Sequence, residues 1–280
     1  MLKKYIVDID CFTKSENMTA ESVYILGLMW ADGTIGSGNL NYSISITGVS
    51  EDLDKNDWIF KKTGNWGKHI RKANGNRKQQ TTYGISDKEF YQKLYDFDYK
   101  FKSKNSAIKI LSVIPIELRR YWWLGYFDGD GCIYTDKNNQ LFFTSSINQD
   151  WSFFDMLPLE IKWKHIVKKR ASGNYSRMLI QGKEEIKNFC NYIYSTIQKD
   201  NIGYYRKYEK FKKLLELKER KVMKLGGVYY NKPNKKWIAR MTYNNVQYAL
   251  GSYLIKEDAI NAVVEKRKQL TEIFNQTKKV

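Results

Sequence analysis

Histidine and cysteine are scarce in this sequence of 280 residues, and each scarcity argues against a kind of site. The three cysteines, Cys11, Cys132 and Cys190, are scattered and odd in number. They fit reduced thiols and offer neither a disulfide framework nor the paired spacing of a zinc site. His69 and His165 are the only histidines, too few for a histidine-rich centre. Metal chemistry would therefore depend on carboxylates, which favour hard ions such as magnesium.

Long apolar segments are also missing. No stretch approaches the ~18 apolar residues that a membrane-spanning helix needs. The N-terminus carries Asp8 and Asp10 and does not resemble a signal peptide. We therefore expect a cytoplasmic protein with no membrane partner.

Positive charge and aromatic residues are abundant instead. Lys and Arg number 48 against 30 Asp and Glu, a net charge of +18, and aromatic residues make up 15% of the chain. Residues 204–280 carry +12 of this charge, and residues 1–203 carry +6. Positive charge interleaved with stacking side chains is typical of proteins that bind nucleic acid. The composition thus predicts a phosphate-rich partner.

A ten-residue string occurs twice in the chain. It reads YILGLMWADG from Tyr24 to Gly33 and WWLGYFDGDG from Trp122 to Gly131, and its two final aspartates, Asp32 and Asp130, lie 98 positions apart. That interval is about one small domain. The repeat therefore predicts two similar halves, each presenting one carboxylate at the end of a helix.

Glycines inside each string have a separate meaning. A glycine in a helix interior costs ~1 kcal/mol relative to alanine, so Gly27 and Gly125 are better explained if two helix backbones approach closely there. Gly33 and Gly131 follow the aspartates, where we expect each helix to end in a left-handed residue. Thr19 is expected to cap the first helix, and residues 115–117 to open the second.

The segments after each string also match. Residues 39–47 and 140–148 alternate polar and apolar side chains, which predicts strands with one buried and one wet face, with Leu141, Phe143 and Ile147 on the buried face of the second. Hairpins are expected near Asn74-Gly75 and Ser172-Gly173-Asn174, each after a Lys-His-Ile string. Because these strings lie 96 residues apart, His69 and His165 are expected at equivalent positions. Helices over 87–98 and 183–197 would close the two halves.

Each repeated string resembles the LAGLIDADG motif of homing endonucleases, whose paired helices bring two acidic groups together. The resemblance implies that Asp32 and Asp130, with Gly33 and Gly131, hold a divalent ion, expected to be Mg²⁺, and that each aspartate serves one DNA strand. It also implies a basic residue late in each half, for which the candidates are Lys102 and Lys104, then Arg206 or Lys207. The first half departs from the motif at Trp30, where an acid is usual and where Asp128 stands in the second half; we expect this to affect packing or capping.

The wet faces of the two sheets are predicted to lie in the major groove of DNA, where amide, hydroxyl and guanidinium groups meet base edges. The candidates are Asn41, Ser43, Ser45, Arg71, Arg77 and Gln79 from the first half, and Thr144, Ser146, Lys169 and Arg177 from the second.

The C-terminal segment resembles the DNA-binding domain of plant ethylene-response factors. The resemblance rests on Gly227-Val228, Lys236-Trp237, Leu250-Gly-Ser-Tyr253 and an alanine-spaced helix from Glu257. It implies three short strands backed by a helix whose Ala259, Ala262 and Val263 face the sheet. Several arginines that read DNA in that family are replaced here, so base specificity does not transfer. The candidate DNA contacts are Lys232, Lys235, Lys236, Arg240 and Tyr243, while Trp237 fits either a core or a contact role.

These observations predict an α+β fold with pseudo-twofold duplicated halves. The expected segments are an extension (1–18), the first half (19–112), the second half (113–203), a basic linker helix (204–225) and a small sheet-and-helix domain (226–280). The predicted activity is metal-dependent hydrolysis of both strands of a long asymmetric double-stranded DNA site by a monomer, from an intron-borne or free-standing gene of a phage or bacterial host. Two alternatives stay open: an intron maturase that binds intron RNA, and a regulator that binds DNA without cutting.

Overall fold

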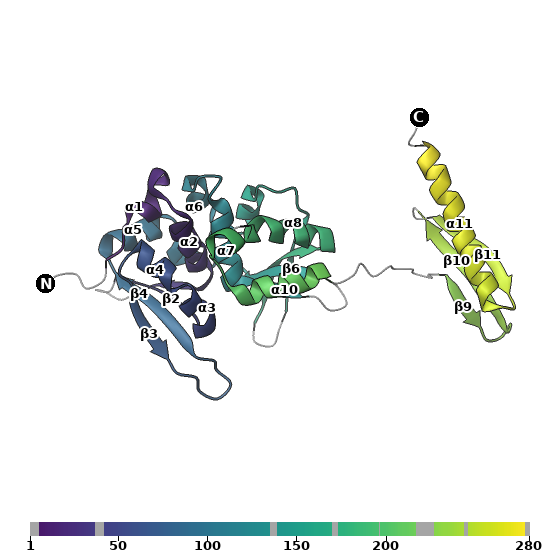
Figure 1. Ribbon diagram of the computed structural model, residues 1–280, viewed down its shortest axis with the longest axis horizontal. Helices are drawn as coiled ribbons and strands as arrows, with labels where there is room; N and C mark the ends of the chain where they lie inside the picture. The colour runs from purple at the N-terminus through teal and green to yellow at the C-terminus, as the bar shows by residue number, and fades with distance from the viewer. Residues whose placement is uncertain are drawn as a thin grey trace. The chain divides into compact units, whose positions relative to one another are not determined.

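The chain folds as two compact units of α+β type with antiparallel sheets, as the sequence predicted. A computed structural model describes residues 6–36, 42–134, 139–169, 173–195, 197–216, 227–243 and 246–277. The units are Met1–Leu215 and Glu216–Val280 (Figure 1). Among the described residues, none of the helices combines the length and apolar character that crossing a bilayer requires.

The first unit contains two halves with matching orders of elements. Those of the first half are α1 (Asp10–Thr13), η1 (Ser15–Asn17), α2 (Ala20–Asp32), β1 (Gly33–Ile35), β2 (Ser43–Val49), α3 (Ser50–Lys55), α4 (Asp57–Thr63), β3 (Gly67–Arg71), β4 (Gln80–Ser86), α5 (Lys88–Asp96) and η2 (Tyr99–Phe101). Those of the second half and its continuation are α6 (Ile108–Val113), α7 (Arg119–Asp130), β5 (Gly131–Tyr134), β6 (Gln140–Ser146), η3 (Ser152–Met156), β7 (Trp163–Lys168), β8 (Tyr175–Gln181), α8 (Lys183–Tyr194), α9 (Ile197–Asp200) and α10 (Tyr205–Glu216).

Each half has a four-stranded antiparallel sheet of the same topology, β1-β2-β4-β3 in the first and β5-β6-β8-β7 in the second. The registers also correspond, since Gly33 pairs with Ile46 and Gly131 pairs with Phe143. The predicted duplication is confirmed at the level of strand pairing.

The helices α2 and α7 lie in the centre of the core. Thr19 caps α2, because its hydroxyl accepts the backbone N–H of Ser22 while the Ser22 hydroxyl accepts the backbone N–H of Thr19. The expectation for α7 was wrong: residues 115–117 form a turn, and the helix begins at Arg119 without a side-chain cap. Its start is instead tied down by N–H groups that donate to the Pro115 carbonyl.

Alternation along the strands matches the sequence pattern with two exceptions, Tyr42 and Ile147. Tyr42, expected on the buried face of the first strand, is 38% exposed, because it lies just before β2 begins at Ser43. Ile44 and Ile46 on β2, like Leu141 and Phe143 on β6, are fully buried. Ile147, expected on the buried face, is 41% exposed. The reason is that β6 ends at Ser146, so the period-two rule no longer applies one residue later.

The two histidines are not equivalent in the sheets. His69 pairs with Thr82 on the exposed face of the first sheet, whereas His165 pairs with buried Met178 and faces Trp151. The residue that corresponds to His165 is Lys68, which pairs with Tyr83. Aligning the two Lys-His-Ile strings therefore placed His69 one residue away from the true counterpart of His165. A shift of one residue along a strand moves a side chain to the opposite face of the sheet.

The expected linker helix belongs to the first unit over most of its length. Tyr204, Tyr208, Phe211 and Leu214 are buried in the same core as the two halves, and Tyr194 packs against this stretch. Residues 217–226 lie outside the described residues. The apolar stripe of α10 therefore serves to dock the helix on the second half.

The second unit is a three-stranded antiparallel sheet covered on one face by a helix. Its elements are β9 (Val228–Asn231), β10 (Lys236–Tyr243), β11 (Val246–Tyr253) and α11 (Lys256–Thr277), and the strand order is β11-β10-β9. Ala239 and Met241 pack against Ala259 and Val263 of the helix. The side chains that alternate with them on β10, including Arg240, therefore lie on the opposite, open face.

Candidate active site

The backbones of α2 and α7 touch at the two predicted glycines. A Cβ atom at Gly27 would lie 2.1 Å from the carbonyl oxygen of Trp122, and one at Gly125 would lie 2.2 Å from that of Tyr24. No real Cβ fits such a space. One turn later, a Cβ at Gly129 would lie 2.2 Å from the Cβ of Ala31 and 3.1 Å from Oδ2 of Asp32. Close packing therefore brings the C-terminal ends of both helices, and the carboxylate of Asp32, together.

The two aspartates share one electrostatic environment. Both residues are at least partly exposed, Asp32 more than Asp130, yet protein atoms surround each carboxyl group closely enough that burial is the largest influence on its pKa. Burial, and next the nearby Asp32 charge, raise the pKa of Asp130 to about 7. Burial also raises the pKa of Asp32, opposed by the charges of Lys102 and Lys207. Two carboxylates that repel one another in this way attract a cation.

Two lysines, one late in each half, contact the C-terminal ends of the helices that carry this pair. Lys102 Nζ donates to the carbonyl oxygens of Met29, Ala31 and Gly33 at 2.9, 2.6 and 2.7 Å. These carbonyls lie at the C-terminal end of α2, where a cation is favoured, and that of Met29 also accepts the backbone N–H of Gly33.

The second lysine repeats this arrangement. Lys207 Nζ donates to the carbonyls of Phe127, Gly129 and Gly131 at 2.7, 3.4 and 2.7 Å. Burial lowers the pKa of each lysine to about 8, against the raising effect of the acids. The two ammonium groups thus occupy equivalent positions, although they stand 105 residues apart in the sequence.

The remaining basic candidates lie elsewhere. Lys104 is exposed in the turn after η2. Arg206 makes a bidentate ion pair with Asp52, at 3.0 and 2.7 Å to Oδ2, and does not face the aspartates. The structure therefore brings Lys102 and Lys207 to the helix ends, and leaves Lys104 and Arg206 out.

The expectation that Gly33 and Gly131 would adopt the left-handed conformation was wrong. Their φ angles are −71° and −78°, in extended backbone, so neither helix ends in a left-handed residue. The need for glycine is instead steric, because a Cβ would lie 2.5 Å from Met29 O at Gly33 and 2.1 Å from the Phe127 ring at Gly131. Their carbonyl oxygens, expected to help hold the metal, accept hydrogen bonds from the two lysines.

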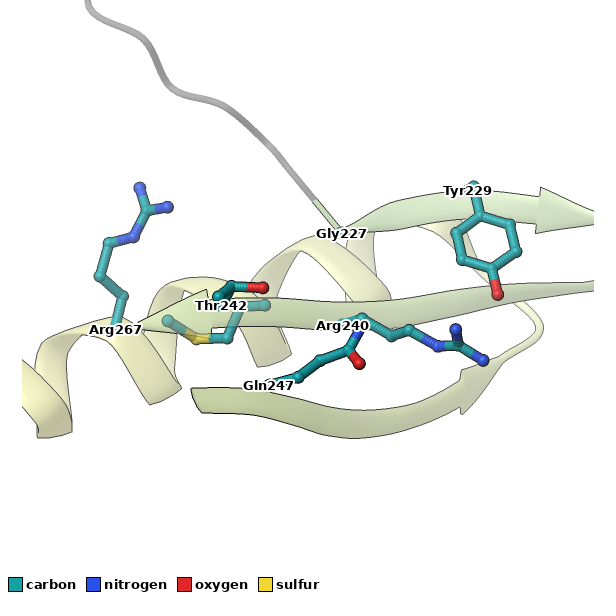
Figure 2. A pocket seen from close by; sticks show the side chains of 7 residues that line it. Gly227, Tyr229, Arg240, Thr242, Gln247 and Arg267 are labelled. Atoms are coloured by element: carbon teal, nitrogen blue, oxygen red, sulfur yellow. The ribbon is translucent and has the colours of Figure 1, made fainter. Parts of the chain in front are cut away.

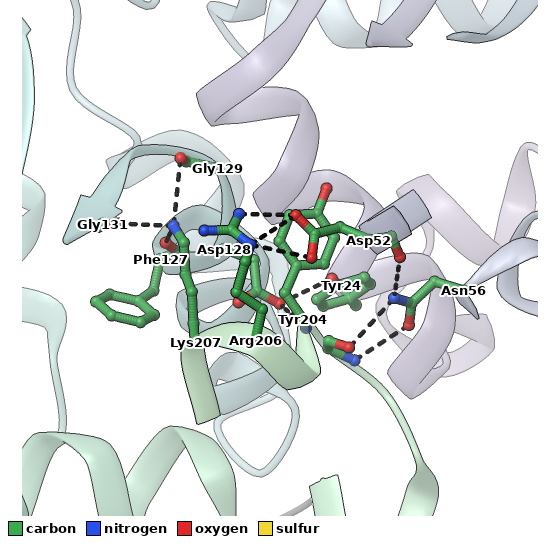
Figure 3. A network of polar contacts seen from close by, with 11 residues as sticks. Tyr24, Asp52, Asn56, Phe127, Asp128, Gly129, Gly131, Tyr204, Arg206 and Lys207 are labelled. Carbon is green, nitrogen blue, oxygen red and sulfur yellow. Dashed lines mark hydrogen bonds and ion pairs between the residues drawn. The ribbon is translucent and has the colours of Figure 1, made fainter. Parts of the chain in front are cut away.

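Sequence reasoning missed a buried polar network behind the second lysine (Figure 3). Asp128 is 1% exposed and accepts hydrogen bonds from the Tyr24 hydroxyl at 2.9 Å and from the Tyr204 backbone N–H at 2.7 Å. Burial raises its pKa to about 7. Asn56, a short distance away, bonds both the N–H and the carbonyl of Gly203. The network joins the first half, the end of α7 and the start of α10, and so fixes the segment that carries Lys207.

One feature of the sequence could have indicated this network, namely a position at which the two motif copies differ. Trp30 stands where Asp128 stands in the second copy, and it packs edge-on against Tyr99 at 5.1 Å. As expected, the departure from the motif affects packing. The partners of Asp128 come from residues 104 and 76 positions away, so no local pattern could have found them.

Hollows lie beside both lysines. One of about 250 Å³ is lined by Lys102, Asp130, Trp30, Ala31 and others, and a smaller one of about 70 Å³ by Lys207, Arg206 and Lys210 among others. No group of three or more His, Cys, Asp or Glu side chains suited to a metal occurs among the described residues. The carboxylate pair nevertheless fits a hard divalent ion, with its other ligands supplied by water or by a substrate phosphate.

If Asp130 holds a cation, its pKa of about 7 should make the affinity for that cation depend on pH. Below pH 7 a bound cation must displace a proton, so the apparent affinity for Ca²⁺ should fall about tenfold per pH unit, and it should level off above pH 8. Calorimetric titration of the protein with Ca²⁺ from pH 5.5 to 8.5 measures this. Asp130→Asn should flatten the profile. An affinity for the unaltered protein that stays constant over that range would contradict the assignment.

The candidate DNA contacts of the first unit lie mainly on the exposed sheet faces. Ser43, Ser45 and Arg71 lie on that face of the first sheet, and Thr144, Ser146 and Arg177 on that of the second. Arg77 and Gln79, after the β3 turn, and Lys169, after β7, are exposed. Asn41 lies outside the described residues.

The second unit places its candidates at one end and on the open face of its sheet. Lys232, Lys235 and Lys236 are exposed at the turn between β9 and β10. Arg240 lies with Tyr229, Thr242 and Gln247 in a pocket of about 520 Å³, to which α11 adds Arg267 (Figure 2). The Tyr243 side chain lies outside the described residues. Trp237 packs on the small core and against Tyr230 at 5.2 Å, which favours its core role.

Comparison with known proteins agrees with the repeated motif in the second half. The family model for a LAGLIDADG-like domain matches residues 117–194. No curated protein matches the sequence. Among solved structures, the chain is similar to the I-LtrWI LAGLIDADG homing endonuclease bound to target DNA, with 15% identity over 72% of this chain and 91% of that chain and a TM-score of 0.45.

Two further structures show a comparable likeness. The homing endonuclease I-WcaI bound to its DNA recognition sequence is 14% identical over 64% of this chain and 85% of that chain, with a TM-score of 0.44. Mesophilic variants of the homing endonuclease I-DmoI are 18% identical over 63% of this chain and 96% of that chain, with a TM-score of 0.41.

Proposed function

We propose that this chain is a site-specific endonuclease that hydrolyses both strands of a long asymmetric double-stranded DNA site. The observation that carries the proposal is the meeting of Asp32 and Asp130 at the ends of two touching helices, each above an equivalent lysine. The match of residues 117–194 to a LAGLIDADG-like domain supports it, since that segment contains Asp130.

The chemistry follows from the side chains. A divalent ion held by the carboxylate pair would neutralise phosphate charge, lower the pKa of a water and stabilise the leaving oxygen. Asp32 and Asp130 hold that ion. Lys102 and Lys207 fix the helix ends that carry the acids, and their positive charges favour the ionised form of both acids, against the larger opposing effect of burial. Because both acids come from one chain, a monomer suffices.

Mg²⁺-dependent cleavage is the direct test. The protein is incubated with a library of random duplexes in Mg²⁺, and the cleaved sequences are recovered. We expect one long asymmetric site, cut on both strands, and no cutting in the presence of a chelator. Selective binding to a site without any cleavage would identify a regulator instead. Rescue of a defective intron's splicing would support the maturase alternative.

Binding should depend strongly on salt. The net charge of +18 suits extensive contact with phosphates. If ~6 to 10 phosphates are neutralised, affinity should fall ~10³- to 10⁵-fold between 50 and 200 mM salt. Fluorescence anisotropy with labelled duplex in Ca²⁺ measures this dependence. A flat response would contradict broad phosphate contact.

Residues 226–280 are proposed to add affinity rather than to choose the cut. Their exposed lysines and Arg240 fit DNA, and they form a unit with its own core. Deleting them should weaken binding more than it alters the cleavage position, as mapped on a sequencing gel. Movement of the cut site, or loss of cleavage at saturating protein, would show that this unit positions the active site.

A further inference from the structure

The exposed face of the second sheet holds one arginine in a fixed posture. The Arg177 guanidinium carbon lies 3.9 Å from the centroid of the Phe142 ring and 5.2 Å from that of Tyr175. Its Nε donates to Oγ1 of Thr144 at 3.2 Å. Phe142 and Thr144 are alternate residues of β6, so they share the exposed face, and Thr144 pairs directly with Arg177 across the sheet. An aromatic platform and a hydrogen bond thus restrain the guanidinium.

This arrangement leaves the outer edge of the Arg177 guanidinium group available to a partner. Among the described residues, the hydrogen bonds of Arg177 use Nε alone, so the four N–H groups on its two terminal nitrogens remain for a partner. The two terminal nitrogens of an arginine can donate to both the O6 and the N7 acceptors of guanine. This pairing is the commonest specific contact in the major groove. Restraint before binding reduces the side-chain entropy lost on contact.

The surroundings favour a base over a phosphate. β8 is an interior strand of the sheet, between β6 and β7. The neighbours of Arg177 on the exposed face include Ile166 and Leu179, which are apolar and cannot share a phosphate. Lys164 and Lys168 lie on the edge strand β7, where they suit the DNA backbone.

The first half lacks this device. The pair that corresponds to Thr144 and Arg177 is Thr47 and Thr82, whose hydroxyls bond to one another at 2.9 Å. Ser45 takes the place of the aromatic platform, Phe142, two residues before the threonine. The feature therefore belongs to one half alone.

We propose that Arg177, held over the Phe142 ring and anchored by Thr144, reads a single guanine in the half-site that the second sheet contacts. The inference rests on the proposed DNA-binding function. It requires neither cleavage nor metal, so it can fail independently of the nuclease activity.

The test uses the full chain and the duplex enriched by binding, not by cleavage, from a random library in Ca²⁺. Each guanine is replaced in turn by 7-deazaguanine, which lacks the N7 acceptor but still pairs with cytosine. One replacement should weaken binding by the unaltered protein about 5- to 150-fold, the range of a bidentate base contact. The same replacement should have no effect on Arg177→Met, which keeps an unbranched side chain but has no N–H donor.

Two further variants sharpen the result. Phe142→Leu should reduce the preference for guanine at that position, because it removes the platform and keeps an apolar side chain. Arg71→Met, the same change at an exposed arginine of the first sheet, should leave the preference for that guanine unchanged, whatever its own effect on affinity. Circular dichroism confirms that each variant is folded.

Other outcomes overturn the inference. If Arg177→Met weakens binding to all sequences alike and lowers the salt dependence, Arg177 contacts phosphate. If every 7-deazaguanine duplex binds normally, no guanine N7 is read. Enrichment of a site that is bound but never cut would reject the nuclease and leave the guanine contact measurable. If no sequence is enriched, both proposals are wrong.

Discussion

Asp130→Asn should lower the rate of double-strand cleavage by at least about 10³-fold while DNA binding stays within a few fold. The carboxylate pair is the proposed holder of the metal, whose charge stabilisation is worth several kcal/mol, and each 1.36 kcal/mol is tenfold in rate. Asparagine keeps the size of the side chain and removes the charge. Conversion of plasmid to linear product in Mg²⁺ measures the rate, and anisotropy in Ca²⁺ measures binding.

A stability measurement separates loss of chemistry from loss of fold. Because folding raises the pKa of Asp130 to about 7 from an ordinary value of 3.8, its ionised form destabilises the metal-free protein above pH 7. The folded protein becomes more stable as the pH falls from 7 toward 4, because Asp130 takes up a proton in the folded state before it does so in the unfolded state. At pH 8 the Asn variant should therefore be at least as stable as the unaltered protein.

The matched control is an aspartate outside the pair. Asp155 lies exposed in η3, so Asp155→Asn should leave cleavage unchanged. Asp32→Asn should reproduce the loss seen at Asp130. Full cleavage by either active-site variant would remove the carboxylate pair from the mechanism.

Gly27→Ala should destabilise the first unit by about 3 kcal/mol or more. Its Cβ would lie 2.1 Å from the carbonyl oxygen of Trp122 and 2.9 Å from the backbone of Tyr126, so the two helices must separate. Overpacking costs about 1 to 3 kcal/mol where side chains can adjust, and occasionally more. Backbone atoms cannot adjust locally. The ~1 kcal/mol that alanine gains in helix propensity offsets only part of this cost.

Urea unfolding followed by far-UV circular dichroism measures the change. Gly84→Ala in β4 is the control, since its Cβ would meet the nearest atom at an ordinary 3.7 Å, from Ile44 O. This control should be neutral or slightly stabilising. Equal stability for Gly27→Ala and the unaltered protein would mean that the two helices do not touch at this point.

The sequence predicted the paired helices well because the signals are local. Each string has a glycine inside an apolar helix and an aspartate five residues later. The glycine indicates a close contact between two helix backbones, and the string occurs twice. The alternation of Ile44 and Ile46 with polar residues likewise required only the geometry of a strand. Where the signal was a coincidence of letters, as with His69 and His165, the prediction was wrong, since pairing register is set by whole strands.

The sequence by itself determined the duplication, the helix pair and the two acids, because periodicity, glycine packing and charge are written in neighbouring residues. Only the tertiary structure decided that Lys207 rather than Arg206 reaches the carbonyls of α7, that Asp128 ties α10 to both halves, and that Arg177 lies on Phe142. These contacts join residues up to 104 positions apart and depend on how elements pack. A buried charge takes whichever partner the packed core brings within reach, and no local pattern contains that choice.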